Sequence, residues 1–203
     1  MYKYLFSRVY DPFMRSLEKK ELFRRRRRLL KDLTGSVLEI GSGTGVNFPF
    51  YRNGVKVLAV EPNVHMWDII NKKIMQNKYE CEIIPAVSSI EKLESEDTIP
   101  NSSLDAAVCT LVLCNVPDAE KTLRFIFQKL KKGGKLIMIE HIRSHHSLTS
   151  KFQDIAAPAW RILADGCCLN RATDQMPEKI GFTKKEETYF STVLPFYQAV
   201  WER

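Results

Sequence analysis

The apolar residues of this chain fall into short, nearly continuous runs, and longer amphipathic stretches lie between them. Short apolar runs bounded by turn residues predict buried β-strands, while apolar positions at three- and four-residue spacing predict helices. The predicted strands are 36–40, 55–62, 81–86, 104–114 and 135–141. A helix capped by Asn63 and another that opens at Pro117 and ends at Gly133 are predicted between them. This alternation predicts an α/β protein with a parallel, doubly wound sheet.

The alternation breaks after the fifth predicted strand. Residues 142–179 predict one or two helices, and the apolar side chains from Phe152 to Ile162 recur at spacings that give one broad apolar helix face. The stretches 182–190 and 192–203 then predict two strands, which a very short connection makes antiparallel. A pure dinucleotide-binding domain does not end in this way.

A cluster of glycines follows the first predicted strand. In 37–48 (VLEIGSGTGVNF), three glycines occupy alternate positions from Gly41 to Gly45, directly behind a strand that ends in Glu39. Glycine permits positive φ and close approach of a ligand to the backbone, and a plain turn rarely needs three. The dinucleotide fingerprint would place its last glycine at Val46. The pattern found here suits a ligand without phosphates, such as S-adenosylmethionine (SAM).

Other residues complete a candidate cofactor site. Glu61 ends the second predicted strand, where a carboxylate can accept both ribose hydroxyls, although a surface acid at a strand end is the alternative. Met66 and the turn at 88–90 are expected to flank an adenine ring. The expected cofactor residues are Glu39, Gly41, Ser42, Gly43, Gly45, Asn47, Glu61, Pro62, Asn63, Met66, Ser88, Ser89, Thr110 and Leu111.

The size of the chain and its cysteines narrow the class of protein. A chain of 203 residues fits a single domain, 1–203, in which 1–34 is expected to form a helical lid and 142–179 a helical insertion on the substrate side. Five cysteines without framework spacing indicate a reducing compartment. No signal peptide is recognised, and no apolar run reaches the roughly 18 residues of a membrane span. A cytoplasmic protein is therefore expected.

The net charge of +7 is concentrated in the run from Arg24 to Arg28. The simplest interpretation is a solvated helix face, because like charges at helical spacing repel each other. Peripheral contact with an anionic membrane is the second, since leucines and a phenylalanine interleave the basic residues. Nucleic acid is the third and the least favoured, because no recognisable binding module accompanies the charge. No obligate protein partner is evident.

Several motifs together resemble a known family. VLEIGSGTG, EPN, VCTLVLCNV, GGKLIMIEH, APAW and DGC resemble the small methyltransferase group that contains the alkyl-thiol S-methyltransferases and their bacterial relatives, over roughly residues 8–203. The resemblance implies the mostly parallel seven-stranded class I methyltransferase sheet, with SAM as cofactor and S-adenosylhomocysteine as product. It matches cofactor-binding positions to Gly41, Gly43, Gly45, Glu61, Thr110 and Leu111.

Two departures from the family accompany this resemblance. The eukaryotic thiol enzymes begin with a hydrophobic membrane anchor, and no such segment is expected in this sequence, which puts their membrane residence in doubt for this chain. Their acid at the end of the second strand is an aspartate, whereas this chain has Glu61. That exchange is expected to preserve the ribose contact.

The expected acceptor is a small, apolar thiol. A thiol is already partly ionised at neutral pH, so holding it in line with the methyl group supplies most of the catalysis. The Asn-Pro-Pro-aromatic signature of many N-methyltransferases is missing, because residues 113–116 are LCNV. A phospholipid or quinone head group is the alternative acceptor, and nucleic acid is a weaker one.

Six residues are candidates for the acceptor side. The expected catalytic residues are Tyr10, Asp11, His141 and Asp165, and the expected substrate-binding residues are Leu113 and Trp160. His141 is either a general base or a hydrogen-bonded histidine that ends a strand. No metal is expected from the histidines at 141, 145 and 146, which lack acidic or cysteine partners at ligand spacing. Cys167 and Cys168 are interpreted as thiols near a pocket, and Cys109 as part of the core.

Overall fold

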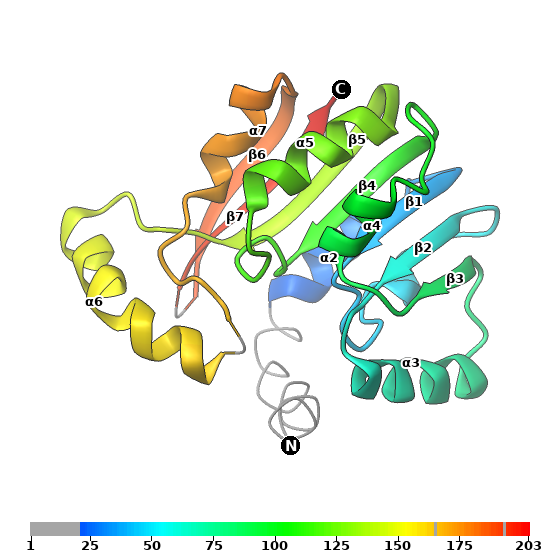
Figure 1. Cartoon of the computed structure of the whole chain (residues 1–203), viewed down its shortest axis with the longest axis horizontal. Coiled ribbons are helices and arrows are strands. Elements are labelled where there is room, and N and C mark those ends of the chain that lie inside the picture. The colour runs from blue at the N-terminus through cyan, green and yellow to red at the C-terminus, as the bar shows by residue number, and fades with distance from the viewer. Residues whose placement is uncertain (1–20, 165, 193) are drawn as a thin grey trace. The chain divides into compact units, whose positions relative to one another are not determined.

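The protein is described here by a computed structural model, which covers residues 21–164, 166–192 and 194–203. Figure 1 draws the remaining residues as a grey trace. The predicted contributions of Tyr10, Asp11 and Asp165, and most of the predicted lid, therefore lie outside the described residues.

Seven strands of the described residues form one sheet in the order β3-β2-β1-β4-β5-β7-β6 (Figure 1). Their bounds are β1 Ser36–Ile40, β2 Lys56–Val60, β3 Glu82–Ala86, β4 Leu104–Thr110, β5 Leu130–His141, β6 Thr183–Ser191 and β7 Pro195–Glu202. The pairs β1–β2 and β2–β3 are parallel, whereas β7 runs antiparallel to both β5 and β6. The predicted fold class, including its antiparallel ending, is confirmed.

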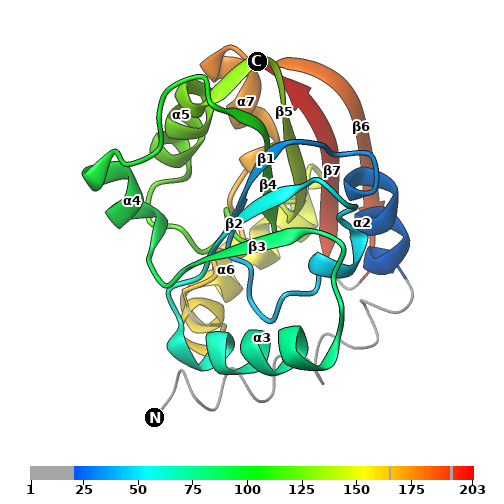
Figure 2. The ribbon, with the colours of Figure 1, turned by 90° about the vertical axis from the view of Figure 1, so that its right-hand side faces the viewer.

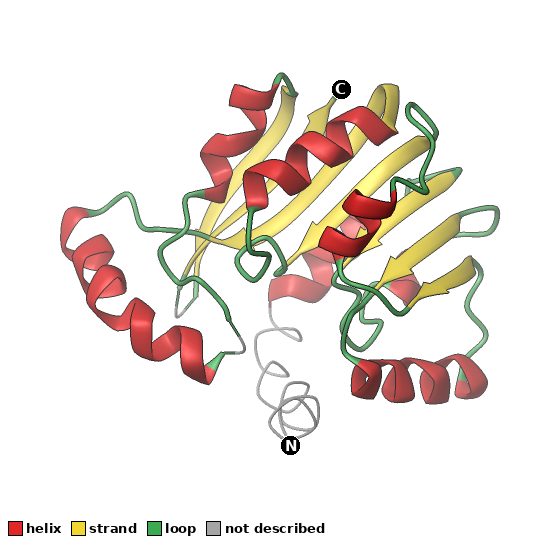
Figure 3. Cartoon of the chain, viewed as in Figure 1, coloured by secondary structure: helices red, strands yellow, loops and turns green. Residues whose placement is uncertain are grey.

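Helices alternate with the strands over most of the described chain (Figure 3). The helices are α2 Phe23–Leu30, α3 Val64–Gln76, α4 Ile90–Glu96, α5 Ala119–Lys129, α6 Ser147–Leu163 and α7 Met176–Ile180, with short 3-10 turns at Phe48–Phe50 and Thr173–Gln175. The Asn63 side chain accepts the backbone N–H of His65 at 3.0 Å, so its predicted role as the cap of α3 is confirmed.

Some predicted boundaries were wrong. Helix α5 ends at Lys129, and Gly133 lies within β5, which begins five residues earlier than predicted. Strand β4 ends at Thr110 because Leu111 takes a positive φ of 58°, a conformation that a strand cannot continue. The apolar run beyond it forms a turn.

The chain forms two compact units, one made of residues up to 98 with 104–107, the other of 99–103 with 108–203. In the first unit, β1, β2 and β3 lie side by side with α3 beside them (Figures 1 and 2). In the second unit, α5 and α7 lie together over one face of the sheet, and Phe127 packs edge-on against Phe182 with ring centroids 4.9 Å apart.

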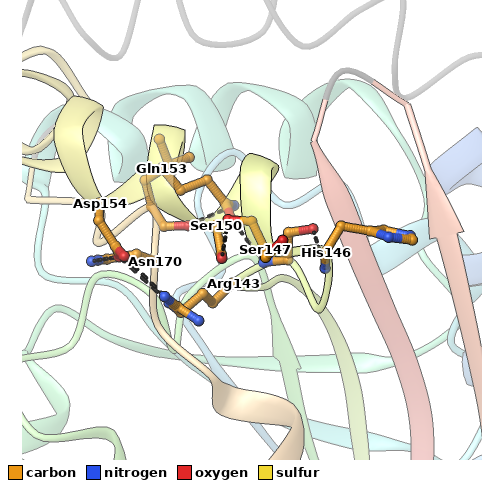
Figure 4. A network of polar contacts seen from close by, with 9 residues as sticks. Arg143, His146, Ser147, Ser150, Gln153, Asp154 and Asn170 are labelled. Atoms are coloured by element: carbon orange, nitrogen blue, oxygen red, sulfur yellow. Dashed lines mark hydrogen bonds and ion pairs between the residues drawn. The ribbon is translucent and has the colours of Figure 1, made fainter.

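Helix α6 has an apolar face that the described residues do not bury. Phe152 is 69% exposed, Ile155 is 80% exposed and Ile162 is 76% exposed. The helix is instead held by polar contacts (Figure 4): the Gln153 amide donates to the carbonyl oxygens of Ile142 and Leu169 and accepts the N–H of Ser144. The helix was predicted correctly, and the pocket that its apolar face was expected to help form stays a prediction. No helix of the described ranges is long and apolar enough to span a bilayer.

Replacing Gly35 by alanine tests the packing that joins β1 to β4. Gly35 has a φ of +71°, and a Cβ there would lie 2.1 Å from Oδ2 of Asp105, which accepts the N–H of Ser36. Gly54 is the matched control, because its φ is +85° but a Cβ would meet nothing within 4 Å. Gly54→Ala should cost about 1–2 kcal/mol of unfolding free energy from φ strain alone. Gly35→Ala should cost about 2 kcal/mol more, measured by urea denaturation, and equal losses would contradict the steric account.

Candidate active site

The loop that follows β1 has the conformation that only glycine adopts easily. Gly41, Gly43 and Gly45 have φ values of 66°, 57° and 73°. A Cβ on Gly45 would lie 2.7 Å from the ring of Phe48, so this glycine also lets the loop close over that ring. A Cβ on Gly43 would meet only the carbonyl oxygen of Gly41, at 3.9 Å. The loop therefore needs all three glycines, and it leaves open space at the middle one.

Glu61 links this loop to the start of α3. Its Oε2 accepts the backbone N–H of Gly43 at 3.0 Å, and its Oε1 accepts that of Asn63 at 2.8 Å. The side chain is mostly buried. A carboxylate accepts hydrogen bonds from ribose hydroxyls as well as from backbone N–H groups. An acid fixed beside an open glycine loop fits the adenosine part of SAM, and Glu61 stays the predicted ribose ligand.

Glu39 lies buried beneath the loop rather than on its surface. Tyr51 donates its hydroxyl to Oε2 of Glu39 at 2.5 Å. Burial raises the pKa of Glu39 from 4.5 to about 7, although the Tyr51 hydrogen bond and the charge of Arg26 lower it. Arg26 in turn donates to Oδ1 of Asn47 at 2.8 Å. Glu39 and Asn47 thus support the loop from inside the protein, and a direct contact with the cofactor stays a prediction.

Arg26 and Tyr51 were missed by the sequence analysis. Arg26 is 2% exposed, so the run of five arginines is not a uniformly solvated helix face. The signal was present in the spacing, because Arg26 lies four residues after Leu22 and three before Leu29, and both leucines are buried. Sequence gives no comparable signal for Tyr51, whose partner is brought to it by the fold.

The other predicted cofactor residues of the first unit occupy several environments. Ser42 is buried, and its N–H donates to the carbonyl oxygen of Val60 at 3.0 Å. Met66 is buried in α3, and Pro62 is exposed just before it. Ser89 caps α4 by accepting the N–H of Lys92, while the hydroxyl of Ser88 donates to the carbonyl oxygen of Ser89. Their contacts with SAM stay predictions.

A buried carboxylate also shapes the turn after β4, in the second unit. Oε1 of Glu140 accepts the N–H groups of Val112 and Leu113, each at 3.0 Å. Burial raises the pKa of Glu140 to about 7, against these two hydrogen bonds, which lower it. The contact fixes the chain just beyond Thr110 and Leu111, two predicted cofactor residues. Leu113, a predicted substrate residue, is fully buried. Sequence analysis did not identify Glu140.

His141 belongs to a buried cluster with two cysteines. Its Nε2 lies 2.9 Å from Sγ of Cys167, and the ligand atoms of Cys114, His141 and Cys167 all lie within 4.8 Å of one another. The Cys114 thiol and His141 lower the pKa of Cys167 to about 5, against burial. The same hydrogen bond and burial raise the pKa of Cys114 well above its ordinary value. The pKa values of the two cysteines are thus shifted in opposite directions, that of Cys167 downward and that of Cys114 upward.

The remaining acceptor-side residues surround this cluster or lie apart from it. Burial lowers the pKa of His141, but the hydrogen bond and charge of Cys167 more than offset this and raise it. The Trp160 indole contributes weakly to the lowered pKa of Cys167, although its Nε1 makes no hydrogen bond within the described residues, and its role as a substrate residue stays a prediction. His145 pairs instead with Asp174 at 3.0 Å. Cys109 is fully buried in β4, as predicted.

Arg171 joins the two loops of the cluster and was also missed. Its Nη1 donates to the carbonyl oxygens of Leu113 and Val116, each at 2.6 Å. The N–H of Cys168 donates to the carbonyl oxygen of Cys114 at 2.8 Å. The loop after α6 is thereby fixed against the turn after β4. Residues about 55 apart in sequence make these contacts, so only the fold brings them together.

The fold and the glycine loop define a class I methyltransferase. The family described as "Methyltransferase domain" matches residues 14–184, and the chain belongs to this family of SAM-dependent methyltransferases. A solved SAM-dependent methyltransferase from Thermotoga maritima, described as a possible histamine N-methyltransferase, has a TM-score of 0.62 at 20% identity and covers 97% of each chain. That likeness shows the fold.

Within this class, the chain is similar to enzymes named for a thiol acceptor. It is 34% identical over 188 residues to the human thiol S-methyltransferase TMT1A, covering 88% of this chain and 72% of that protein. It is 36% identical over 176 residues to the rat thiol S-methyltransferase TMT1B, covering 82% of this chain and 68% of that protein.

Replacing Glu39 by glutamine tests the buried carboxylate beneath the loop. Its pKa rises from 4.5 to about 7 on folding, so the folded protein binds more protons between these values. Stability from Glu39 is therefore present below pH 4.5 and lost as the pH rises through 7. Wild-type unfolding free energy should fall by about 1–3 kcal/mol from pH 5 to pH 8 relative to Glu39→Gln.

Urea denaturation at both pH values makes this measurement, and the exposed Glu80→Gln is the control, which should follow the wild type. Identical pH dependence in wild type and Glu39→Gln would show that the carboxylate is ionised in the folded protein at no cost.

Proposed function

We propose that this methyltransferase transfers the methyl group of SAM to the sulfur of a small, apolar thiol. The observation that carries the acceptor is the similarity to thiol S-methyltransferases, at 34% and 36% identity over most of both chains. The family alone supports methyl transfer but leaves the acceptor open. A phospholipid, a quinone or a nucleic acid has no comparable support.

SAM supplies an electrophilic methyl group on a sulfonium. In this proposal, the glycine loop holds the amino-acid part of SAM, and the Glu61 carboxylate, positioned by its contacts with Gly43 and Asn63, accepts the ribose hydroxyls. Because Glu61 is already fixed by Gly43 and Asn63, little side-chain entropy remains to be lost when the ribose binds. Glu39, Arg26 and Tyr51 keep the loop in shape beneath this site.

The acceptor side is proposed to lie in the second unit, around Trp160 and His141. A thiol needs little activation, because a few per cent is ionised at neutral pH and the thiolate is strongly nucleophilic. Its surroundings here are rich in sulfur, since Cys114 and Cys167 are buried beside His141. The role of His141 as a general base stays a prediction. Its Nε2 contacts Cys167, so this nitrogen would have to leave that contact before it could accept a proton from the acceptor.

Two further predictions concern the periphery of the molecule. The lid over the pocket stays a prediction for residues 1–20, while Phe23 of α2 packs on Phe50 with ring centroids 5.1 Å apart. Contact with an anionic membrane now depends on Arg24, Arg27 and Arg28, which are exposed and line a basic cavity of about 890 Å³. Arg25 pairs with Glu21 at 3.3 Å.

A panel of acceptors tests the proposed function directly. Purified protein is given SAM with a labelled methyl group and, separately, an aliphatic thiol, vesicles containing phosphatidylethanolamine, a quinone or RNA. We expect label in the thioether of the aliphatic thiol and none in the other products. Transfer to the thiol should not change with salt, whereas transfer to RNA would fall steeply as salt increases. Label in lipid or RNA but not in the thiol would refute the proposal.

Removing the Glu61 carboxylate tests the cofactor site. Glu61→Ala should weaken SAM binding by about 10- to 100-fold in calorimetry, because two hydrogen bonds to a charged group are lost. NAD should not bind measurably to either protein. Glu61→Asp is the matched control, since it keeps the acid and should retain most of the affinity. Unchanged SAM affinity in a folded Glu61→Ala variant would remove Glu61 from the site.

A further inference from the structure

Three soft ligand donors converge in the second unit from three different segments. Cys114 lies in the turn after β4, His141 is the last residue of β5, and Cys167 lies in the loop after α6. Each is buried, and their ligand atoms lie within 4.8 Å of one another. An ordinary core would place aliphatic side chains here. The cluster instead brings together three side chains that can bind a metal ion. The proposed binding of SAM by the glycine loop and Glu61 gives these three side chains no role.

We propose that Cys114, His141 and Cys167 bind one zinc ion and leave its fourth coordination position for the sulfur of the acceptor. The zinc site stands on the geometry of the cluster alone, while the role of the fourth position rests on the proposed thiol methylation.

The distances in the cluster suit a tetrahedral zinc ion. Zinc–sulfur bonds of about 2.3 Å and zinc–nitrogen bonds of about 2.0 Å place neighbouring ligand atoms about 3.6–3.8 Å apart. The cluster already lies within 4.8 Å. The closest pair, Nε2 of His141 and Sγ of Cys167, is 2.9 Å apart and has to open by about 0.7 Å. Small torsional changes in two side chains can supply such a shift.

The backbone that carries the three ligands is already fixed. Glu140 holds the turn before Cys114 through two N–H groups. Arg171 and the N–H of Cys168 tie the loop of Cys167 to the same turn. On the far side, Gln153 holds α6 to the chain just after His141 (Figure 4). Ligands fixed in this way need little ordering when the metal binds, which favours affinity.

The donor set selects zinc and a site with an open position. Two thiolates and an imidazole suit zinc, and two thiolates balance its charge in a buried position. Catalytic zinc sites use three protein ligands with a fourth position for water or substrate, and Cys₂His is one such set. Within the described residues, no other histidine, cysteine, aspartate or glutamate joins the group. The described residues thus supply three of the four ligands of a tetrahedral site, and in this proposal an external sulfur supplies the fourth.

Methyl transfer at this position is a displacement of S-adenosylhomocysteine by the acceptor sulfur. The acceptor thiol binds zinc through sulfur and releases its proton to solvent. The resulting thiolate uses a sulfur lone pair to form a bond to the methyl carbon of SAM, while the bond from that carbon to the sulfonium breaks. Its electron pair stays on the sulfur of S-adenosylhomocysteine. The neutral thioether product is a weaker zinc ligand than the thiolate and dissociates.

Metal binding tests the proposal without any assay of activity. The full chain, stripped of metal, is titrated with Zn²⁺ and separately with Co²⁺, whose absorption reports tetrahedral sulfur ligation. We expect one ion per chain and sulfur-to-cobalt charge-transfer bands. Cys114→Ser, His141→Ala and Cys167→Ser should each weaken Zn²⁺ binding by more than about 100-fold, since even the loss of an outer partner costs 10- to 100-fold. Cys168→Ser is the matched control and should bind normally.

Two more measurements separate the parts of the proposal. Zn²⁺ should protect Cys114 and Cys167 of the wild-type chain from alkylation relative to Cys168, which covers the case in which a ligand variant fails to fold. An aliphatic thiol added to the Co²⁺ protein should strengthen the charge-transfer bands. Absence of stoichiometric Zn²⁺ binding, or its retention in all three ligand variants, would overturn the site. Unchanged Co²⁺ spectra with thiol would overturn the role of the fourth position, whether or not the thiol is methylated.

Discussion

The backbone N–H groups beyond the strand ends have to find acceptors, and buried carboxylates supply them. Turns after parallel strands leave N–H groups that neither a strand nor a helix satisfies, and each would be costly if buried without a partner. Glu61 accepts two such groups in the first unit, from Gly43 and Asn63. Glu140 accepts two in the second unit, from Val112 and Leu113. The conformations of the two candidate loops depend on these contacts.

This solution has an electrostatic cost. Burial raises the pKa of Glu140, as it does that of Glu39, to about 7, so neither carboxylate is as easily ionised as an exposed one. Arg26 and Tyr51 reduce this cost for Glu39. A carboxylate that accepts several hydrogen bonds also becomes a rigid connection, since removing it would leave more than one buried donor unsatisfied. Rigidity of the loops is thus obtained at the expense of stability near neutral pH.

The sequence predicted the strands, the cap at Asn63 and the antiparallel ending because these depend on local pattern. The predicted end of β4 was wrong because a single residue interrupts an apolar run that otherwise has the pattern of a strand. Nothing in the apolar run after β4 marks the positive φ of Leu111, which ends the strand early. Sequence also missed the cluster of Cys114, His141 and Cys167, because ligands about 26 residues apart have no recognisable spacing, and only the ends of two strands and a helix bring them together.

Helix α6 shows how polar contacts can replace apolar packing. An amphipathic helix normally buries its apolar face and leaves its polar face in water. Here the buried hydrogen bonds come from Gln153, and exposed ones come from Asp154, which binds Arg143 and Asn170 (Figure 4). Four large apolar side chains of the helix, those already named and Leu148, stay more than two-thirds exposed. Their exposure forgoes about 25 cal/mol for each Å² of apolar surface left in water, so the fold of this unit does not explain why they are apolar. What the polar contacts do explain is the position of Trp160 and of the loop that carries Cys167, because the helix that leads to both is held by hydrogen bonds at its first half.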